Sequence, residues 1–523
     1  MSDSNDREQP MTRDAARGRR GRSRPARQAN ALVQLPWRQP RNPYPPMEIA
    51  DPVQLQAIHD TSLRILGELG VRVLSERVLD LFERAGAKVD RGEGIVRIDH
   101  ELVEQALSTT PSQFTLTGSN PDRRLVIGGN HMAFGLVAGP PNVHDQIRGR
   151  RTGTLADYEN FIRLAHSFNA IHIIGNQVTA PQELPANNRH LDTYRANLTL
   201  SDLSFHCTAI GRGRAMDGIE MMAIARGMPV EAMRDDPGVI TIISVNSPRL
   251  LDGEMAEGLM AMAAHGQPVA ITPFTLMGAM TPVTLAAAMA QQNAEALFGV
   301  TLTQLVRPGA PVMYGAFTSN VDMKSGAPAF GTPENTKANL IAGQLARRYG
   351  LPYRTSNANA SNAVDLQAAY ETCFASFGAA LGGGNLIYHA AGWLEGGLTA
   401  SFEKLVLDVE ILQNLMEILR PVDFSEAELG FDAIAGVPTG GHFFGEAHTL
   451  ERYETAFYTP LLSDWSAYGN WEAAGAKTAL TRATEIWQRA LADYQPPAID
   501  PSIREALDAY VARRKEAIGS GEP

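Results

Sequence analysis

The chain has 523 residues, of which 44% are hydrophobic and 20% are charged, and its formal net charge is −11. This length fits one large domain with additions, or two to three average domains. Residues 1–46 contain ten arginines and four acids, a balance of +6 that leaves −17 for the remainder. An acidic body of this kind argues against general nucleic-acid binding.

The cysteine content and the absence of long apolar runs bear on the compartment. Cys207 and Cys373 are far apart and form no CxxC pair, which suits a reducing cytoplasm. No apolar run approaches the roughly 18 residues that a membrane span needs. The pair Arg19-Arg20 is not followed by an apolar stretch, so we interpret 1–46 as a disordered, Arg-rich arm. We expect a cytoplasmic protein that binds neither membrane nor nucleic acid.

The region 47–128 predicts a small N-terminal α+β cap. Apolar residues spaced three and four apart over 53–66 indicate a helix, and Ser75 has the character of an N-cap for a second helix through Ala85. Short alternating stretches predict strands at 71–73, 96–98, 114–117 and 125–127.

From residue 129 to about 420, short apolar strands alternate with amphipathic helices. The eight predicted strands span residues 131–137, 171–176, 204–210, 239–245, 268–274, 311–317, 352–357 and 385–389. The predicted helices span residues 155–167, 191–200, 215–225, 254–265, 284–306, 334–349, 366–381 and 402–419. This alternation predicts a parallel sheet, and eight units match an α/β fold of the (β/α)8 TIM-barrel type. An open doubly wound sheet is the alternative, but no GxGxxG follows the first strand.

Residues 421–523 predict a helical C-terminal extension that ends in a charged helix over 502–517. We expect this extension to pack across the barrel or across a subunit interface, so a homo-oligomer is the expected assembly.

In a barrel of this kind the active site lies at the carboxyl ends of the strands. The residues that follow the predicted strands are rich in amides and aromatics and poor in carboxylates and lysines. The chain has no H-x-H pair, no lysine on a predicted strand, no G-x-S-x-G elbow and no Walker A motif, which argues against several hydrolase, Schiff-base and nucleotide chemistries. Only Asp145 and Glu395 could serve as the paired carboxylates of a glycosidase.

The remaining side chains are typical of a site for a quaternary ammonium, because aromatic faces attract a cation while amides orient a carboxylate or hydroxyl. The candidate rings are Phe274, Phe317, Trp393, Phe443 and Phe444. The polar candidates at strand ends are Asn246, Asn357 and Glu395. His389 ends the eighth strand and is either a catalytic group or a buried histidine satisfied by a backbone carbonyl.

Four pairs of stretches resemble the trimethylamine methyltransferase family. They are residues 246–252 with 273–286, 314–317 with 322–328, 392–399 with 401–405, and 440–443 with 448–450. The resemblance covers about residues 50–515 and leaves the Arg-rich arm outside. It implies a barrel that moves a methyl group from an amine to the cobalt of a separate corrinoid protein. The corrinoid would then come with that partner, and we expect no metal or tightly bound cofactor on this chain.

Some members of the family carry pyrrolysine in the loop after the seventh strand. Here that loop lies in residues 356–362, and we align Asn359, or a direct neighbour, with the special position. The resemblance therefore implies a member without pyrrolysine, similar to glycine betaine:corrinoid methyltransferases, and argues against trimethylamine as the substrate. We expect His389 and Asn359 to be the catalytic residues and His442 with Phe443 to join the substrate-binding set.

The chemistry agrees with a quaternary substrate. Its nitrogen already carries a full positive charge, so the neutral amine is a fair leaving group when Co(I) attacks, and the protein mainly has to hold the N–CH3 bond in line in a dry pocket. Two alternatives stay open. One is a non-catalytic quaternary-amine-binding protein on the same scaffold, and the other is a lyase barrel that uses His389 and Glu395 as acid and base.

Overall fold

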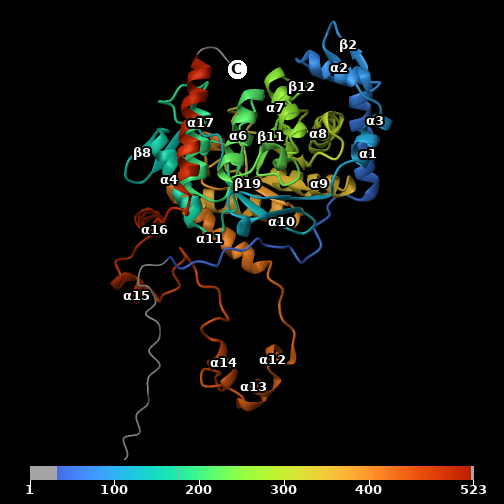
Figure 1. The fold of residues 1–523 in the computed structure, drawn as a ribbon. Coiled ribbons are helices and arrows are strands. Elements are labelled where there is room, and N and C mark those ends of the chain that lie inside the picture. Colours follow the sequence, from blue (N-terminus) through green and yellow to red (C-terminus); the bar gives the residue numbers. More distant parts are fainter. Residues whose placement is uncertain (1–31, 176, 520–523) are drawn as a thin grey trace, which may run out of the picture. The chain divides into compact units, whose positions relative to one another are not determined.

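The computed structural model describes residues 32–175 and 177–519. Eight parallel strands close into a barrel in chain order (Figure 1). They are β6 (Ala133–Leu136), β9 (Ile173–Ile174), β10 (Ser204–His206), β11 (Val239–Ile243), β13 (Val269–Ile271), β15 (Val312–Gly315), β18 (Tyr353–Ser356) and β19 (Leu386–Ala391). Each strand lies within or overlaps the stretch predicted from the sequence. Pairing between β19 and β6 closes the ring, so the open doubly wound alternative is wrong.

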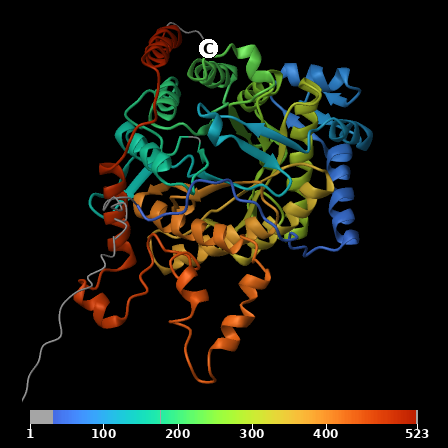
Figure 2. The same cartoon turned by 60° about the horizontal axis from the view of Figure 1, so that its bottom comes forward.

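Eight helices follow these strands and surround them (Figure 2). They are α4 (Leu155–Ser167), α5 (Arg189–Leu200), α6 (Arg212–Ala225), α7 (Gly253–Ala264), α8 (Leu285–Val306), α9 (Pro333–Arg348), α10 (Leu366–Leu381) and α11 (Phe402–Ile418). Several begin where a side-chain oxygen accepts a backbone N–H of the first turn, which satisfies a donor that the helix itself cannot. These capping residues are Thr154, Asp252, Thr332, Asp365 and Ser401.

An apolar hairpin closes the amino-terminal end of the barrel. Strand β4 (Gln113–Leu116) pairs with β5 (Leu125–Gly128) in an antiparallel register. Their buried side chains Phe114, Leu116, Leu125 and Ile127 belong to one core cluster with residues of the barrel strands. Those barrel residues are Ala133, Ile173, Ile240, Ala270, Met313, Leu386 and Tyr388. The base of the barrel is therefore a packed apolar core.

The predicted cap region forms helices and short strands. They are α1 (Pro52–Arg64), a π-helical turn (Ile65–Leu69), β1 (Val71–Val73), α2 (Glu76–Arg84), β2 (Lys88–Asp90), β3 (Ile95–Arg97) and α3 (His100–Ser108). Ser75 precedes α2 as predicted, but its side chain accepts no capping hydrogen bond. The sheet has the order β12-β1-β3-β2, and β12 (Leu250–Leu251) comes from the loop after β11. The cap therefore shares its sheet with a barrel loop.

The predicted disordered arm must be shortened. Residues 1–31 lie outside the described residues, but residues 33–46 are bound to the barrel. The backbone N–H of Leu35 donates to Gln413 at 2.7 Å, and the amide of Asn42 donates to the Ala380 carbonyl at 3.2 Å. Trp37 packs against the core cluster at the base of the barrel, a contact that the Arg-rich composition of the arm conceals.

Short strands that the sequence did not predict extend the barrel at its mouth. Strands β14 (Phe274–Met277), β16 (Phe317–Val321) and β17 (Pro328–Ala329) form one small sheet. A second sheet has the order β20-β21-β7-β8, with β20 (Trp393–Leu394), β21 (Thr399–Ser401), β7 (Asn142–Asp145) and β8 (Gly149–Thr152). Among the described residues no helix is both long and apolar enough to cross a membrane.

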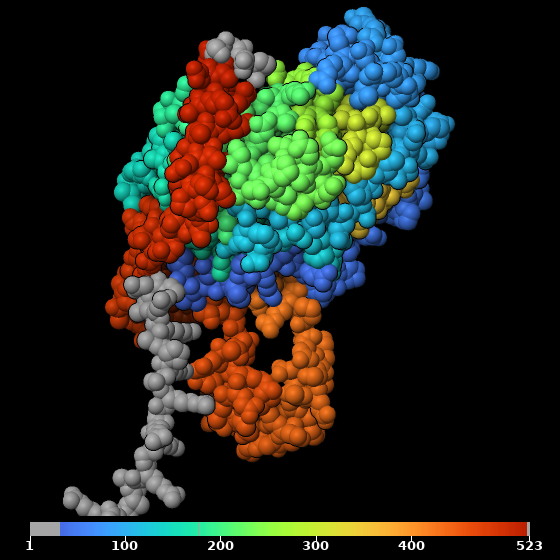
Figure 3. All heavy atoms as spheres, viewed as in Figure 1, coloured from blue at the N-terminus to red at the C-terminus, as the bar shows by residue number. Residues whose placement is uncertain are grey.

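The C-terminal region contains helices of two kinds. Helix α16 (Ala479–Ala492) packs against α11 and α4, and α17 (Pro501–Gly519) packs against α5 and α6. Residues 420–461, which we call the protruding segment, contain no buried residue (Figure 3). Its helices are α12 (Glu426–Leu429), α13 (Phe431–Gly436) and α14 (Ala447–Arg452). Its apolar side chains that are more than half exposed are Val422, Phe424, Leu429, Phe431, Ile434, Phe444, Leu450, Tyr453 and Phe457. The short helix α15 (Tyr468–Ala473) follows it.

Candidate active site

An aromatic cluster lies at the carboxyl ends of barrel strands. Strands β13 and β15 are each continued by a further strand, β14 and β16, and the parallel register of these two places Phe274 opposite Phe317. The two ring centroids are 5.1 Å apart in an edge-to-face arrangement. Both residues are only partly buried, so part of this aromatic surface stays accessible.

Three further rings complete the cluster around Phe317. The rings of His389 and Trp393 lie 5.4 Å and 6.1 Å from Phe317, and they are 4.2 Å from each other. Phe330, just after β17, stacks on Phe317 at 5.2 Å and was not expected from the sequence. The structure thus brings together four of the candidates proposed from the sequence: Phe274, Phe317, His389 and Trp393.

His389 is a neutral ring in this cluster. It is 6% exposed, its φ is +54°, and its ring makes no hydrogen bond to the described residues. Burial lowers the pKa of His389 well below its ordinary value, and the charge of Arg354 lowers it further. A neutral imidazole can border a cation without repelling it, whereas an imidazolium could not.

The loop after β18 fixes Trp393. Its indole N–H donates to the backbone oxygen of Asn359 at 3.1 Å. Gly397, at φ +105°, leaves room for the indole, because a Cβ there would lie 2.5 Å from the ring. The side chain of Asn359 is fully buried and donates to Ala368 and Thr372 of α10 at 3.3 Å and 3.1 Å. In the structure Asn359 positions Trp393 through its backbone oxygen. A catalytic role for Asn359 stays a prediction.

A buried ion pair on α11 supports the same region. Lys404 and Asp408 are fully buried and paired with each other. Asp408 also accepts hydrogen bonds from the backbone N–H of Gly392 at 2.8 Å and from the hydroxyl of Thr372 at 2.9 Å. Burial lowers the pKa of Lys404 and raises that of Asp408, and their mutual attraction opposes both shifts. The pair therefore holds the backbone next to Trp393.

Three other predicted binding residues have partners of their own. Asn357 is fully buried, and its amide donates to Ala390 at 3.1 Å, while its Oδ1 has no hydrogen-bond partner within the described chain. Asn246 is exposed and bonds to a neighbouring aspartate in its loop. Glu395 accepts two hydrogen bonds from Arg150, at 2.9 Å and 3.0 Å. Asn246 and Glu395 do not belong to the aromatic cluster.

The C-terminal candidates His442 and Phe443 lie on the protruding segment. The ring of His442 contacts Phe444, 5.6 Å away, and Phe443 is 44% exposed. Neither ring is part of the aromatic cluster in the single chain. Their assignment rested on a sequence signature, which gives no information about position in space, and their role in substrate binding stays a prediction.

A buried arginine inside the barrel was not expected from the sequence. Along β18 the side chains of Tyr353 and Thr355 bond outward to Asn339 of α9, so Arg354 and Ser356 point inward. Arg354 is 1% exposed. A charged residue in the middle of a barrel strand is unusual, because arginine is almost never fully buried without a partner. An arginine in the middle of a predicted strand was thus the feature of the sequence that could have indicated this buried charge.

Arg354 lies between the aromatic cluster and the barrel core. Its guanidinium carbon is 5.6 Å from the ring centre of Phe317 and 5.2 Å from that of Tyr388. One Nη donates to the Ala316 carbonyl at 3.5 Å, and Nε has no hydrogen-bond partner in the described part of the chain. Burial lowers the pKa of Arg354 to about 10, which still leaves it charged at neutral pH.

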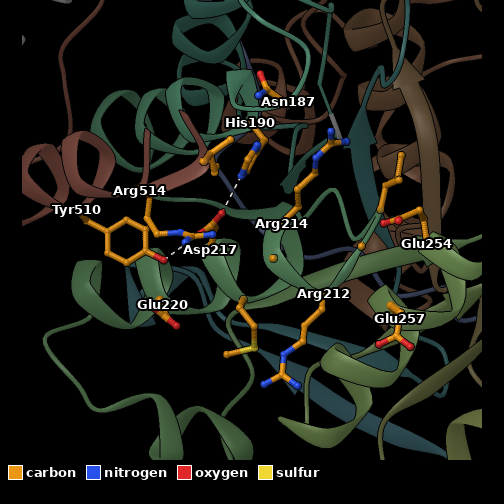
Figure 4. Close-up of a pocket in the computed structure, with 15 residues that line it drawn as sticks. Asn187, His190, Arg212, Arg214, Asp217, Glu220, Glu254, Glu257, Tyr510 and Arg514 are labelled. Carbon is orange, nitrogen blue, oxygen red and sulfur yellow. Dashed lines mark hydrogen bonds and ion pairs between the residues drawn. The ribbon is translucent and has the colours of Figure 1, made fainter. Parts of the chain in front are cut away.

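A large pocket of about 880 Å³ lies outside the barrel, between α5, α6, α7 and α17 (Figure 4). On one wall Asp217 accepts hydrogen bonds from His190, Tyr510 and Arg514, at 2.8, 2.8 and 2.7 Å. These bonds tie the C-terminal helix to α5 and α6, which is a structural role. Among the described residues no group of three or more side chains is arranged to hold a metal ion. Because the bonds of this pocket serve to pack α17, we regard the aromatic cluster at the barrel mouth as the candidate site.

Comparison with known proteins gives a consistent picture over most of the chain. The model of the trimethylamine methyltransferase (MTTB) family matches residues 16–519. A glycine betaine methyltransferase of Desulfitobacterium hafniense (strain Y51) is 38% identical over 89% of this chain and 97% of its own. A trimethylamine methyltransferase of Desulfitobacterium hafniense (strain DSM 10664 / DCB-2) is 30% identical over 89% and 94%. A proline betaine:corrinoid methyltransferase of Eubacterium limosum is 27% identical over 87% and 96%.

Proposed function

Because this chain belongs to the trimethylamine methyltransferase family, we propose that it transfers a methyl group from a quaternary amine, such as glycine betaine, to the Co(I) of a corrinoid protein. The observation that carries the proposal is the aromatic cluster at the barrel mouth, where Phe274, Phe330, His389 and Trp393 surround Phe317 at centroid distances of 5.1 to 6.1 Å. Such rings attract a quaternary ammonium through their quadrupoles.

The proposed reaction is a displacement at one N–CH3 carbon. Co(I) supplies the electron pair of the new bond, the C–N bond breaks, and the nitrogen keeps its pair and leaves as a neutral tertiary amine. No proton is transferred, so the site needs no acid or base, which suits a neutral His389. The rings hold the ammonium and exclude water, and they fix the direction in which the methyl group points.

Within this proposal the side chains act in different ways. Phe274, Phe317, Phe330 and Trp393 bind the substrate, and His389 borders it as a neutral ring. Asn359 acts through Trp393, whose indole N–H it accepts at its backbone oxygen. A lyase that uses Glu395 as an acid or base is disfavoured, because that carboxylate is bound to Arg150.

Two protein partners belong to the proposal. A corrinoid protein docks at the barrel mouth in the cytoplasm and carries the cobalt. A second copy of this chain covers the protruding segment, because its apolar side chains cannot cover themselves and monomers rarely expose so much apolar surface. Helix α10 exposes a matching apolar face, with Leu366 81% and Phe374 56% exposed, so two copies can cover both surfaces reciprocally.

The proposal is tested by mixing the purified protein anaerobically with Co(I) corrinoid protein and a panel of amines. We expect glycine betaine or a related quaternary amine to convert cobalt to its methylated form, followed by absorption, and trimethylamine to give no conversion. Saturable binding of an amine without methyl transfer from any member of the panel would favour the non-catalytic binding protein.

A further inference from the structure

The barrel interior contains a positive charge without a counter-charge. Arg354 is fully buried, yet no described carboxylate pairs with it, and the titratable neighbours that raise its pKa are the neutral tyrosines Tyr388 and Tyr353 rather than acids. Two acids near the mouth have other partners, since Glu395 is paired with Arg150 and Asp408 with Lys404. A buried charge is costly unless a partner compensates for it, and contacts with the rings of Phe317 and Tyr388 offset only part of that cost.

The polar groups around Arg354 are hydrogen-bond donors that lack acceptors. The Nε–H of Arg354, the hydroxyl of Ser356 and the hydroxyl of Tyr388 are buried without a hydrogen-bond partner in the described chain. The backbone N–H of Ile242 donates to Nε2 of His206 at 3.0 Å, which places the ring proton on Nδ1, and that atom is also unpartnered. These groups gather around Tyr388: the His206 ring lies 5.5 Å from its ring, the guanidinium carbon of Arg354 lies 5.2 Å from it, and Ser356 is its register partner on β18.

We infer that Arg354 binds the carboxylate of the substrate, which is therefore a zwitterionic betaine, and that Ser356 and Tyr388 donate hydrogen bonds to the same group. This inference rests on the proposed function and names its substrate class and the residue that selects it. Phe317 contacts the guanidinium on one side and three other aromatic rings elsewhere, so the carboxylate and the ammonium are separated by a short spacer.

The same arginine rejects amines that have no acid group. Choline or protonated trimethylamine would bring a second positive charge beside Arg354 without a counter-charge, and a like charge in a dry site is strongly unfavourable. Specificity for betaines therefore comes from one attractive and one repulsive effect of a single side chain.

Binding measurements on full-length variants test the inference. We expect the wild-type protein to bind glycine betaine and to bind choline poorly, by calorimetry. Arg354→Gln should weaken glycine betaine binding by at least about 100-fold, because it leaves the carboxylate without its ion pair. The same variant should bind choline as well as the wild type or better, and Arg354→Lys should restore part of the glycine betaine affinity. Equal losses for glycine betaine and choline in Arg354→Gln would overturn the inference.

A stability measurement separates ligand binding from a structural role. Ligand-free Arg354→Met should melt at or above the wild-type temperature, because it removes an uncompensated charge. The control Arg151→Met should melt lower, because Arg151 is paired with the buried Asp145. Glycine betaine should raise the midpoint of the wild type but not that of Arg354→Met. A lower midpoint for ligand-free Arg354→Met would mark a structural arginine and overturn the inference.

The two proposals can fail separately. Binding of betaines through Arg354 with no methylation of Co(I) would support the inference and contradict the proposed reaction. Methyl transfer from choline or tetramethylammonium as readily as from amines that carry a carboxylate would support the reaction and contradict the inference.

Discussion

Phe317 illustrates how much of the site depends on single positions. A single residue, Ala316, separates the end of β15 from the start of β16, and this short break places Phe317 above the barrel core while Arg354 reaches it from β18. Its ring is therefore shared between a fixed guanidinium and the aromatic cluster. A substrate that bridges the two would contact Phe317 along its whole length.

Replacing Trp393 by leucine should weaken binding of a quaternary amine by about 5- to 30-fold, because a desolvated cation–π contact contributes roughly 1–2 kcal/mol. Calorimetry with the amine identified in the methyl-transfer assay measures this change. Trp465→Leu is the matched control, since Trp465 is 69% exposed and lies outside the cluster. Equal affinities of the wild type and Trp393→Leu would show that the indole is only a packing residue.

Buried neutral histidines make stability depend on pH. Burial lowers the pKa of His206 to about 3, while in the unfolded chain it returns to about 6.5. Below that unfolded value the unfolded chain binds a proton that the folded chain does not, so the free energy of unfolding falls as the pH falls. Between pH 6.5 and 5.5 we expect a loss of about 1 kcal/mol from this residue.

Urea titrations of the wild type and of His206→Gln at both pH values measure this loss as a difference. Subtracting the pH dependence of His206→Gln from that of the wild type removes the effect of buried carboxylates such as Glu295. The raised pKa of Glu295 changes the free energy of unfolding with pH in the opposite direction. The same pH dependence in both proteins would contradict a neutral, buried His206.

The aromatic members of the site could be predicted from the sequence, because aromatic residues after consecutive barrel strands must meet at one end. Arg354 could not be predicted in the same way. The strand Tyr353-Arg354-Thr355-Ser356 shows no apolar alternation, so nothing in it distinguishes the inward from the outward face. Phe330 follows a two-residue strand that exists only through pairing with β16, which sequence periodicity does not reveal.

At the level of elements, α11 does more than cover the barrel. Its residues Lys404 and Asp408 lie one helical turn apart and reach the backbone of Gly392 and the hydroxyl of Thr372. The helix thereby sets the position of β20, which starts with Trp393. Helix α11 thus positions the indole of Trp393, although it contributes no ring to the site.

Lys404→Met should destabilise the protein by about 3–5 kcal/mol, because it leaves Asp408 buried and charged without its partner. The double variant Lys404→Met/Asp408→Leu should recover part of this loss. Chemical denaturation measures both, and the exposed pair Lys477–Glu485 supplies the control, since Lys477→Met should change stability by at most about 1 kcal/mol. Unchanged stability in Lys404→Met would mean that the ion pair is not a structural support.

The barrel elements were predictable because each strand and each helix carries its own local pattern. Alternating apolar stretches and side-chain caps such as Thr332 and Asp365 do not depend on distant residues. The pairing of β12 with β1 in the cap and of β21 with β7 at the mouth joins segments far apart in the sequence and was not predicted. Strand pairing between distant segments cannot be recognised from the sequence of either short segment alone.

At the level of the whole molecule, the protruding segment is the clearest sign of further assembly. Phe424→Asp combined with Phe431→Asp should lower the native mass measured by light scattering, because both side chains are 74% exposed and would face the second copy. The control Val53→Asp changes a similarly exposed residue on α1, at 78%, and should leave the mass unchanged. A monomeric wild-type protein at micromolar concentration would contradict the proposed assembly.

The apolar base formed by β4 and β5 has a consequence for kinetics. A barrel sealed at one end has a single opening, which the amine, the demethylated product and the corrinoid protein must share. The amine therefore has to enter before the corrinoid protein docks. The demethylated amine leaves only after the corrinoid protein has dissociated. Steady-state rates should follow a compulsory order, with the demethylated amine competing against the substrate and with excess corrinoid protein inhibiting by docking on the empty enzyme.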